Sequence, residues 1–224
     1  MRSARRFGLL AAGTLGSLLL AAASAAAAPN DSTGMQEISN LFWIVAILGV
    51  AIGVFVGIVM VITILKFRIR KGHDKPTFNP NRSSHKLEAA WTIIPAIILL
   101  VIGMLAFQTL AFTDTLPQHP DVYVAAIGHQ WYWEFWVNYT NGTHVHSVGD
   151  LSVPSNVTIL MNVTSVDVDH SIFIPALGVH MDAIPGHLNQ VWFKPTMPGE
   201  FHIECTQFCG LNHYAMVGTL TVTS

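Results

Sequence analysis

Charge is scarce in this chain, and it is unevenly distributed. Only 11% of the 224 residues are Asp, Glu, Lys or Arg. Residues 113–224 contain nine acidic side chains but only one Lys or Arg, which is Lys194. Such an acidic region repels the phosphate backbone of nucleic acids, so nucleic-acid binding is excluded, whereas a basic protein partner would be attracted.

Cysteine is also scarce, because the chain has only Cys205 and Cys209. In a compartment outside the cytoplasm, two cysteines are compatible with one structural disulfide. A disulfide closing a loop this short would be strained, however. Whether the two thiols form a disulfide or bind a metal therefore has to be inferred from the residues around them.

Charged residues are missing altogether from two long stretches, Leu41–Leu65 and Ala89–Phe112, of 25 and 24 residues. At a rise of about 1.5 Å per residue, each helix would exceed the roughly 30 Å hydrocarbon core of a bilayer. Pro95 lies near the start of the second stretch, where a kink is tolerated. We therefore predict a hairpin of two transmembrane helices within residues 29–112.

The remaining charges predict the orientation of this hairpin. Residues 1–28 combine an Arg-rich start, an apolar core and a run of small residues, which is typical of a cleaved secretory signal. The alternative is an uncleaved third helix. The loop 66–88 is basic and is expected to be cytoplasmic. The protein is then a multi-pass protein of the plasma (inner) membrane, with residues 113–224 on the outer, periplasmic face.

From Asp121 onward the sequence consists of short runs rich in β-branched and aromatic residues, separated by Asn-Gly, Pro-Ser and Pro-Gly turn signals. About 110 residues of such strands predict an all-β Greek-key sandwich or barrel. One run, "GHQWYWEFWV", alternates so that Trp131 and Trp133 are expected on the same face of one strand.

The stretch "ECTQFCGLNHYAM" contains Cys205, Cys209, His213 and Met216 in the pattern C-x3-C-x3-H-x2-M. Thiolate, imidazole and thioether are soft or borderline ligands, and together they favour copper over magnesium or calcium. Zinc sites use thiolate and imidazole but rarely thioether. The motif therefore predicts a copper site.

The number of thiols indicates how many copper ions bind. A blue-copper site uses one Cys, two His and a weak axial ligand. The second thiol favours two copper ions bridged by both sulfurs, each with one imidazole and one weaker ligand. His170, in "DVDHSIFIP", is the candidate for the second imidazole, with Met216 and the main-chain oxygen of Gln207 as the weaker ligands. Such a centre would relay electrons rather than bind a substrate.

Four stretches carry a resemblance to a known family: "HKLEAAWTIIPAIIL", "GHQWYWEF", "DHSIFIPALGVHMDAIPG" and "PGEFHIECTQFCGLNHYAM". They resemble subunit II of the haem–copper cytochrome c oxidases, in which a helical hairpin precedes a cupredoxin domain with the binuclear copper A centre. The resemblance covers nearly the whole mature chain. It implies a haem-bearing subunit I, other oxidase subunits, and cytochrome c or another periplasmic electron donor as partners. The copper ligands that it implies are His170, Cys205, Gln207, Cys209, His213 and Met216.

The same resemblance implies roles for two further residues. Trp131 corresponds to the tryptophan through which electrons enter, although packing alone would also explain a tryptophan in this run. Glu88 corresponds to a glutamate at the mouth of a proton pathway into subunit I. Its alternative role is an ordinary interfacial carboxylate beside Lys86.

The chain departs from the family at Gln207, where many relatives have a glutamate whose side chain binds magnesium. A neutral amide is a poorer ligand for a hard cation than a carboxylate, which argues against magnesium here. The implied function is electron input to a terminal oxidase that reduces oxygen to water and pumps protons, with no complete active site in this chain alone. Copper delivery or storage is the rival, and a copper-free quinol oxidase subunit is disfavoured by the two cysteines.

Overall fold

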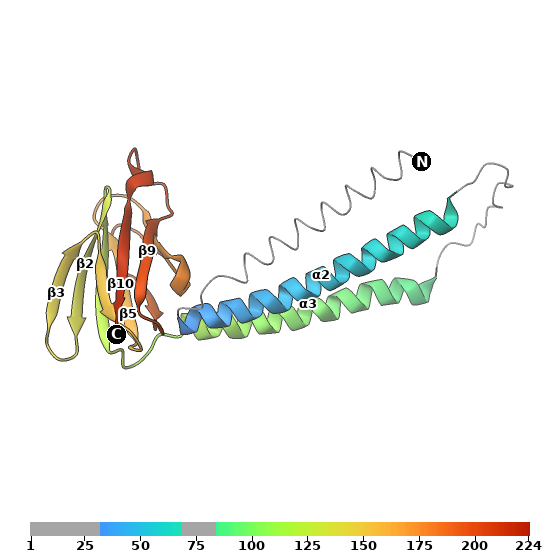
Figure 1. Ribbon diagram of the computed structural model, residues 1–224, viewed down its shortest axis with the longest axis horizontal. Coiled ribbons are helices and arrows are strands. Elements are labelled where there is room, and N and C mark those ends of the chain that lie inside the picture. The colour runs from blue at the N-terminus through green and yellow to red at the C-terminus, as the bar shows by residue number, and fades with distance from the viewer. Residues whose placement is uncertain (1–31, 69–83) are drawn as a thin grey trace. The chain divides into compact units, whose positions relative to one another are not determined.

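A computed structural model of the chain describes residues 32–68 and 84–224. The expected signal segment 1–28 and most of the basic loop 66–88 lie outside these residues, so both remain predictions. Within the described part, two long helices precede a β domain (Figure 1). The described chain forms two compact units, one of which is Asn40–Leu110 and the other Ala111–Ser224 together with the residues up to Ser39.

The two helices are α2 (Thr33–Phe67) and α3 (His85–Asp114), and they contain the two predicted apolar stretches. Neither helix has a buried side chain, so their apolar surfaces are free to face lipid or other subunits. Two hydroxyls inside the apolar stretches are satisfied locally: Thr63 donates to the carbonyl of Val59 at 2.7 Å and Thr92 to the carbonyl of Glu88 at 2.9 Å. Both helices are long and apolar enough to cross a membrane.

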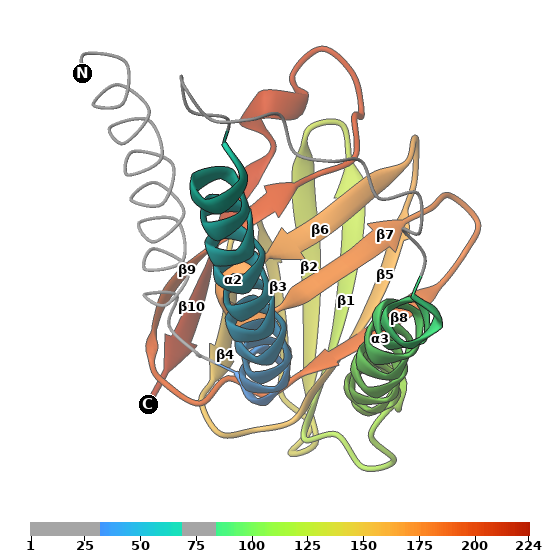
Figure 2. The same ribbon diagram turned by 90° about the vertical axis from the view of Figure 1, so that its right-hand side faces the viewer.

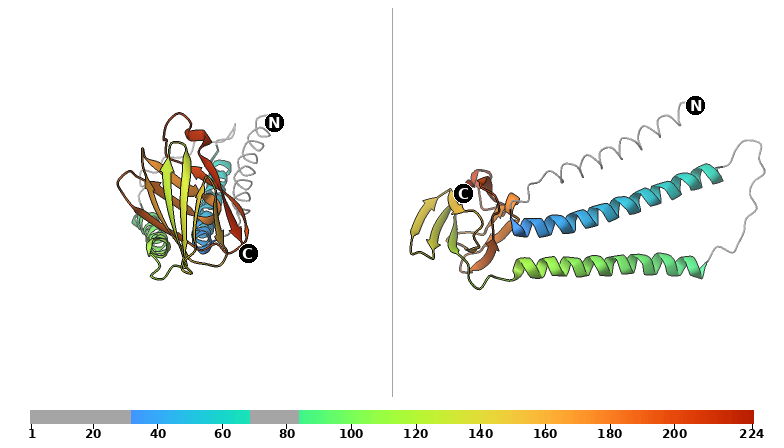
Figure 3. Two further views of the ribbon diagram at one scale, coloured as in Figure 1. Left: turned by 90° about the vertical axis from the view of Figure 1, so that its left-hand side faces the viewer. Right: turned by 60° about the horizontal axis from the view of Figure 1, so that its bottom comes forward.

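The β domain is a sandwich of two five-stranded sheets, which Figure 2 shows as stacked layers and Figure 3 shows from two further directions. The first sheet has the order β3-β2-β1-β5-β8 and the second the order β4-β10-β9-β6-β7. The predicted helical hairpin followed by a cupredoxin-like β domain is therefore confirmed. The strands are β1 (Val122–His129), β2 (Tyr132–Tyr139), β3 (His144–Val148), β4 (Leu151–Pro154), β5 (Ile159–Ser165), β6 (His170–Ile174), β7 (Val179–Ala183), β8 (Asn189–Phe193), β9 (Gly199–Cys205) and β10 (Val217–Thr223).

The core lies between the two sheets and follows from alternation along the strands. In β2, Trp133, Phe135 and Val137 are buried, whereas the intervening side chains lie on the outer face. In the opposite sheet, Ile172 of β6 and Ile203 of β9 are fully buried. Burial of this apolar surface is the main term that stabilises the sandwich.

The first residues of α2 are tied to the sandwich. Ser32 is fully buried, and its hydroxyl donates to the carbonyl of Leu177 at 2.6 Å. The same oxygen accepts the backbone N–H of Met35 at 3.0 Å, so Ser32 caps the helix. At Gly178, an added Cβ would lie 3.2 Å from the side chain of Ile38. Ser32 and the first turns of α2 thus belong to the same compact unit as the β domain.

Candidate metal centre

The Cys/His/Met loop lies between the end of β9 and the start of β10. Cys205 is the last residue of β9, and the short 3₁₀ helix η2 (His213–Ala215) follows within the loop. The loop closes on itself, because the backbone N–H of Cys205 donates to the carbonyl of Met216 at 3.1 Å. A further hydrogen bond joins the N–H of His213 to the carbonyl of Gly210. These bonds bring the motif residues to one end of the sandwich.

His170 reaches the same place from the neighbouring strand. It is the first residue of β6, and two residues further on Ile172 pairs with Cys205 of β9. The imidazole is fully buried, and its Nδ1 lies 3.8 Å from the Cys205 sulfur. Space for the ring depends on Gly128 of β1, since a Cβ there would lie 2.8 Å from Cδ2 of His170.

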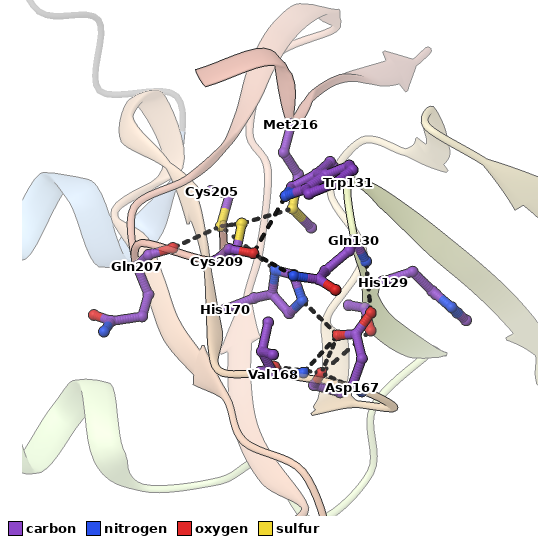
Figure 4. Close-up of polar contacts among 12 residues, drawn as sticks. His129, Gln130, Trp131, Asp167, Val168, His170, Cys205, Gln207, Cys209 and Met216 are labelled. Carbon is purple, nitrogen blue, oxygen red and sulfur yellow. Dashed lines mark hydrogen bonds and ion pairs between the residues drawn. The ribbon is translucent and has the colours of Figure 1, made fainter. Parts of the chain in front are cut away.

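The structure brings the six predicted copper ligands together, and Figure 4 labels all of them except His213. The sulfurs of Cys205 and Cys209 are 3.8 Å apart. The carbonyl oxygen of Gln207 lies 3.3 Å from the Cys205 sulfur, while its side chain is exposed and points away from the cluster. The Cys209 sulfur lies 3.4 Å from Nδ1 of His213 and 3.8 Å from the Met216 sulfur.

This donor set fits bridged metal ions. A metal–thiolate bond in a zinc site is about 2.3 Å, so an ion of similar size can contact two sulfurs at this separation. Cys205, Cys209 and Met216 are buried, which keeps water from the soft donors. Burial, reinforced by the neighbouring Cys205 thiol, raises the pKa of Cys209 to about 12. A metal cation bound here would stabilise the thiolate and displace its proton.

Asp167 lies beside the buried imidazole, a contact that no pattern in the sequence indicates. Its carboxylate lies 2.9 Å from Nε2 of His170. An imidazole that donates its Nε2 proton to Asp167 has an unprotonated Nδ1 facing the thiols, as a metal ligand requires. Burial would raise the pKa of Asp167, but hydrogen bonds from His170 and from the N–H groups of Val168 and Gln130 lower it to about 2.

Trp131 lies beside the cluster but not in a strand, contrary to the expected alternation with Trp133. Residues 130 and 131 form the turn between β1 and β2, because β1 ends at His129 and β2 begins at Tyr132. The indole Nε1 of Trp131 donates to the carbonyl of Cys209 at 3.2 Å, and the side chain of Gln130 donates to the same oxygen at 2.7 Å. Trp133 is fully buried and meets the His170 ring edge-on.

Glu88 belongs to the other compact unit and lies in the first turn of α3. Its carboxylate lies 3.2 Å from Nδ1 of His85, and both side chains are exposed. A carboxylate in the first turn favours the helix through the helix dipole. This contact is compatible with the interfacial interpretation, and it does not test a role in proton transfer.

Two family profiles match the chain. The one described as "Cytochrome C oxidase subunit II, transmembrane domain" matches residues 21–109, and "Cytochrome C oxidase subunit II, periplasmic domain" matches residues 144–222. The periplasmic domain of subunit II of cytochrome oxidase (CoxB) of Bradyrhizobium japonicum is a similar solved structure. The two sequences are 33% identical, and the match covers 49% of this chain and 88% of the other, with a TM-score of 0.44.

Curated relatives carry the same name. Cytochrome c oxidase subunit 2 of Cereibacter sphaeroides is 30% identical, over 88% of this chain and 75% of the relative. The probable cytochrome c oxidase subunit 2 of Rickettsia bellii is 29% identical, over 88% and 78%. The Branchiostoma floridae protein is 36% identical, but this chain spans only 65% of its length. The two family profiles and the relative from Cereibacter sphaeroides show that the chain belongs to the cytochrome c oxidase subunit II family.

Proposed function

We propose that this chain is the electron-input subunit of a respiratory terminal oxidase. It accepts single electrons from cytochrome c or an equivalent periplasmic donor and passes them to haem in subunit I. That partner reduces oxygen to water and pumps protons, and this chain carries no complete active site alone. The observation that carries the proposal is the meeting of two thiols, two imidazole nitrogens, a thioether and a carbonyl oxygen at one end of the sandwich.

A bound binuclear copper A centre would supply a one-electron carrier whose geometry changes little on reduction. The chain's own residues would hold it in a rigid, dry setting. Cys205 and Cys209 would hold the ions through their sulfurs, while His170 and His213 would each offer Nδ1. Rigidity follows from position, since His170 and Cys205 belong to paired strands of one sheet. Fixed ligands cost little reorganisation when an electron arrives.

Trp131 is the proposed point of electron input. Its indole is partly buried and is tied to the main chain of the Cys209 ligand by a hydrogen bond of 3.2 Å. This bond offers a short connection from the surface of the domain to the metal centre. The acidic balance of residues 113–224 would attract a basic donor to this domain.

The membrane orientation and the proton role are parts of the same proposal. The β domain would lie on the periplasmic side and the segment that joins the two helices on the cytoplasmic side. Glu88 would then lie at the cytoplasmic end of α3, at the entrance of a proton pathway into subunit I. Magnesium is not part of the proposal, because Gln207 has no carboxylate to offer.

Copper delivery is the rival function, and burial argues against it. A delivery site has to release its metal to a partner, so its ligands have to be accessible. Here His170 is 0% and Met216 is 1% exposed. Two ligands enclosed this fully favour retention of the metal and its use as a relay.

Electron paramagnetic resonance of the purified, copper-loaded full chain tests the proposal. One unpaired electron shared equally by two copper nuclei is the expected signal. The Cys205→Ser variant should lose that signal, because one bridging sulfur is gone. A signal from a single copper nucleus in the wild-type chain would instead favour delivery or a mononuclear site.

Two variants in the assembled oxidase separate electron input from proton uptake. Trp131→Phe removes the indole N–H, so reduction of the copper centre by the donor should slow while the copper spectrum stays unchanged. Glu88→Gln should leave that reduction rate unchanged and slow steady-state oxygen consumption. Normal oxygen consumption in Glu88→Gln would mean that this carboxylate has no role in proton uptake and is only an interfacial side chain.

A further inference from the structure

Asp167 presents its two carboxylate oxygens to different parts of the site (Figure 4). Oδ1 lies 2.9 Å from Nε2 of His170. Oδ2 accepts the backbone N–H of Gln130 at 2.7 Å. One carboxylate therefore joins the strand that carries a metal ligand to the turn between β1 and β2.

The carboxylate itself is held in one orientation by its own turn. Oδ1 accepts the N–H of Val168 at 2.6 Å and lies 3.2 Å from the hydroxyl of Ser165. That hydroxyl gives its one proton to the carbonyl of Val168 at 2.6 Å and accepts the backbone N–H of Asp167 at 3.2 Å. Ser165 is only 6% exposed. With its neighbours fixed, Asp167 has little freedom to swing toward solvent.

The contact at Gln130 extends to the indole that follows it in sequence. Gln130 and Trp131 both donate their side-chain N–H groups to the carbonyl of Cys209. Space for these two side chains depends on Gly210, because a Cβ there would lie 2.9 Å from Nε2 of Gln130 and 3.3 Å from the Trp131 ring. Asp167 and the Cys209 carbonyl thus hold the Gln130–Trp131 turn at two separate points.

We propose that Asp167 is a positioning residue that fixes the His170 imidazole and the Gln130–Trp131 turn relative to each other. It acts through its neighbours, and it rests on the proposed function because His170 is there a copper ligand and Trp131 the input residue. In this role the carboxylate sets both the direction of Nδ1 toward the thiols and the place of the indole. A mere surface charge that attracts a basic donor would do neither.

The experiment compares Asp167→Ala with Asp169→Ala in the full chain. Asp169 is exposed and lies next to His170, so its removal deletes the same charge at nearly the same place. Hydrogen–deuterium exchange of the copper-free chain reports on the Gln130 turn. In the copper-loaded chain, the copper hyperfine pattern and midpoint potential report on His170. Reduction by a basic cytochrome c, measured at low and high salt, separates docking from electron transfer.

Asp167→Ala should speed exchange at the Gln130 amide, alter the hyperfine pattern and slow reduction at both salt concentrations. Asp169→Ala should slow reduction only at low salt. Asp167→Asn keeps one oxygen as acceptor and should recover part of the exchange protection. If the alanine variant does not fold, the exchange, the hyperfine pattern and the reduction rate are compared between Asp167→Asn and wild type instead.

The proposal is overturned if Asp167→Ala behaves as Asp169→Ala does, with exchange, hyperfine pattern and potential unchanged. Its failure is distinct from failure of the proposed function. A wild-type chain without a two-copper signal would refute the copper relay. The exchange measurement in the copper-free chain would still decide whether Asp167 holds the Gln130–Trp131 turn.

Discussion

Two regions of the β domain pair a carboxylate with imidazole at nearly the same distance but in opposite surroundings. Asp167 lies 2.9 Å from His170, whose side chain is 0% exposed and whose other ring nitrogen faces a thiol. Glu134 lies 2.9 Å from His129 and 3.0 Å from His146, which are 19% and 43% exposed. A carboxylate partner alone therefore does not distinguish the proposed copper ligand His170 from the other two histidines. The thiol beside its second ring nitrogen does.

Strand alternation produces this difference. Glu134 lies between the buried Trp133 and Phe135 in β2, so its side chain is on the outer face. There the two histidines pack on aromatic rings, His129 stacking on Tyr132 at 4.6 Å between ring centroids. His170 instead begins β6 with its ring turned into the sandwich. We call His129, Glu134 and His146 the outer carboxylate cluster.

Replacing one histidine from each region should separate them most clearly. His170→Ala removes a proposed copper ligand, so the two-copper spectrum should disappear. It also leaves the Asp167 carboxylate without its ring partner, which should cost about 1.5–3 kcal/mol in the copper-free chain. His146→Ala should leave the spectrum intact. Copper spectroscopy and thermal unfolding of both full-length variants check this. Loss of the spectrum in His146→Ala would mean that the outer cluster also affects copper binding, contrary to the expected difference between the two regions.

A smaller effect is expected from filling the space beside the buried imidazole. In Gly128→Ala, the new Cβ would lie 2.8 Å from the His170 ring, and the ring has to shift. Overpacking of this kind typically costs about 1–3 kcal/mol. Gly199→Ala is the matched control in another strand, since its Cβ would lie 3.2 Å from the tip of the Phe201 ring. Urea unfolding should show a larger loss for Gly128→Ala, together with a changed copper spectrum. Equal losses would mean that Gly128 has no special relation to His170.

Much of this architecture could be predicted from local sequence. Runs without charge predicted the helices, and the spacing of Cys205, Cys209, His213 and Met216 predicted one cluster because a single loop holds all four. His170 is far from the cysteine loop in the sequence, so placing it in the cluster depends on the strand that carries it. Its partner Asp167 is harder to predict, because an aspartate three residues before a histidine is not a distinctive motif. Asp167 follows β5, and the parallel pairing of β5 with β1 sets Ser165 opposite Gly128, which brings Asp167 between His170 and Gln130.

The aromatic run shows why alternation alone misplaces a residue. "GHQWYWEFWV" has the composition of one strand, but the chain reverses at Gln130 and Trp131, so that β1 and β2 pair antiparallel. No glycine, proline or asparagine marks this turn at its two central positions. Hydrogen bonds from Gln130 and Trp131 to the Cys209 carbonyl stabilise it instead. Those bonds join residues about eighty positions apart, beyond the reach of a local pattern.

The smallest effect is expected at the outer carboxylate cluster, and its sign depends on pH. Burial would raise the pKa of Glu134, but hydrogen bonds from His129, His146 and Trp136 outweigh it and lower the pKa. A carboxyl whose pKa is lowered on folding stabilises the folded state above its unfolded pKa. That contribution is lost as the pH falls through the lowered value.

Glu134→Gln should therefore destabilise the copper-free chain at about pH 6, by less than about 1 kcal/mol because the cluster is near the surface. The gap between wild type and variant should close as the pH falls below about 4.3, the ordinary glutamate pKa. Using the copper-free chain keeps protonation of the metal ligands out of the comparison. Glu200→Gln, at an exposed position of β9, is the matched control. A gap that widened toward acid pH would mean that the carboxylate of Glu134 is not stabilised by folding, and that the two histidines contact it without favouring its charge.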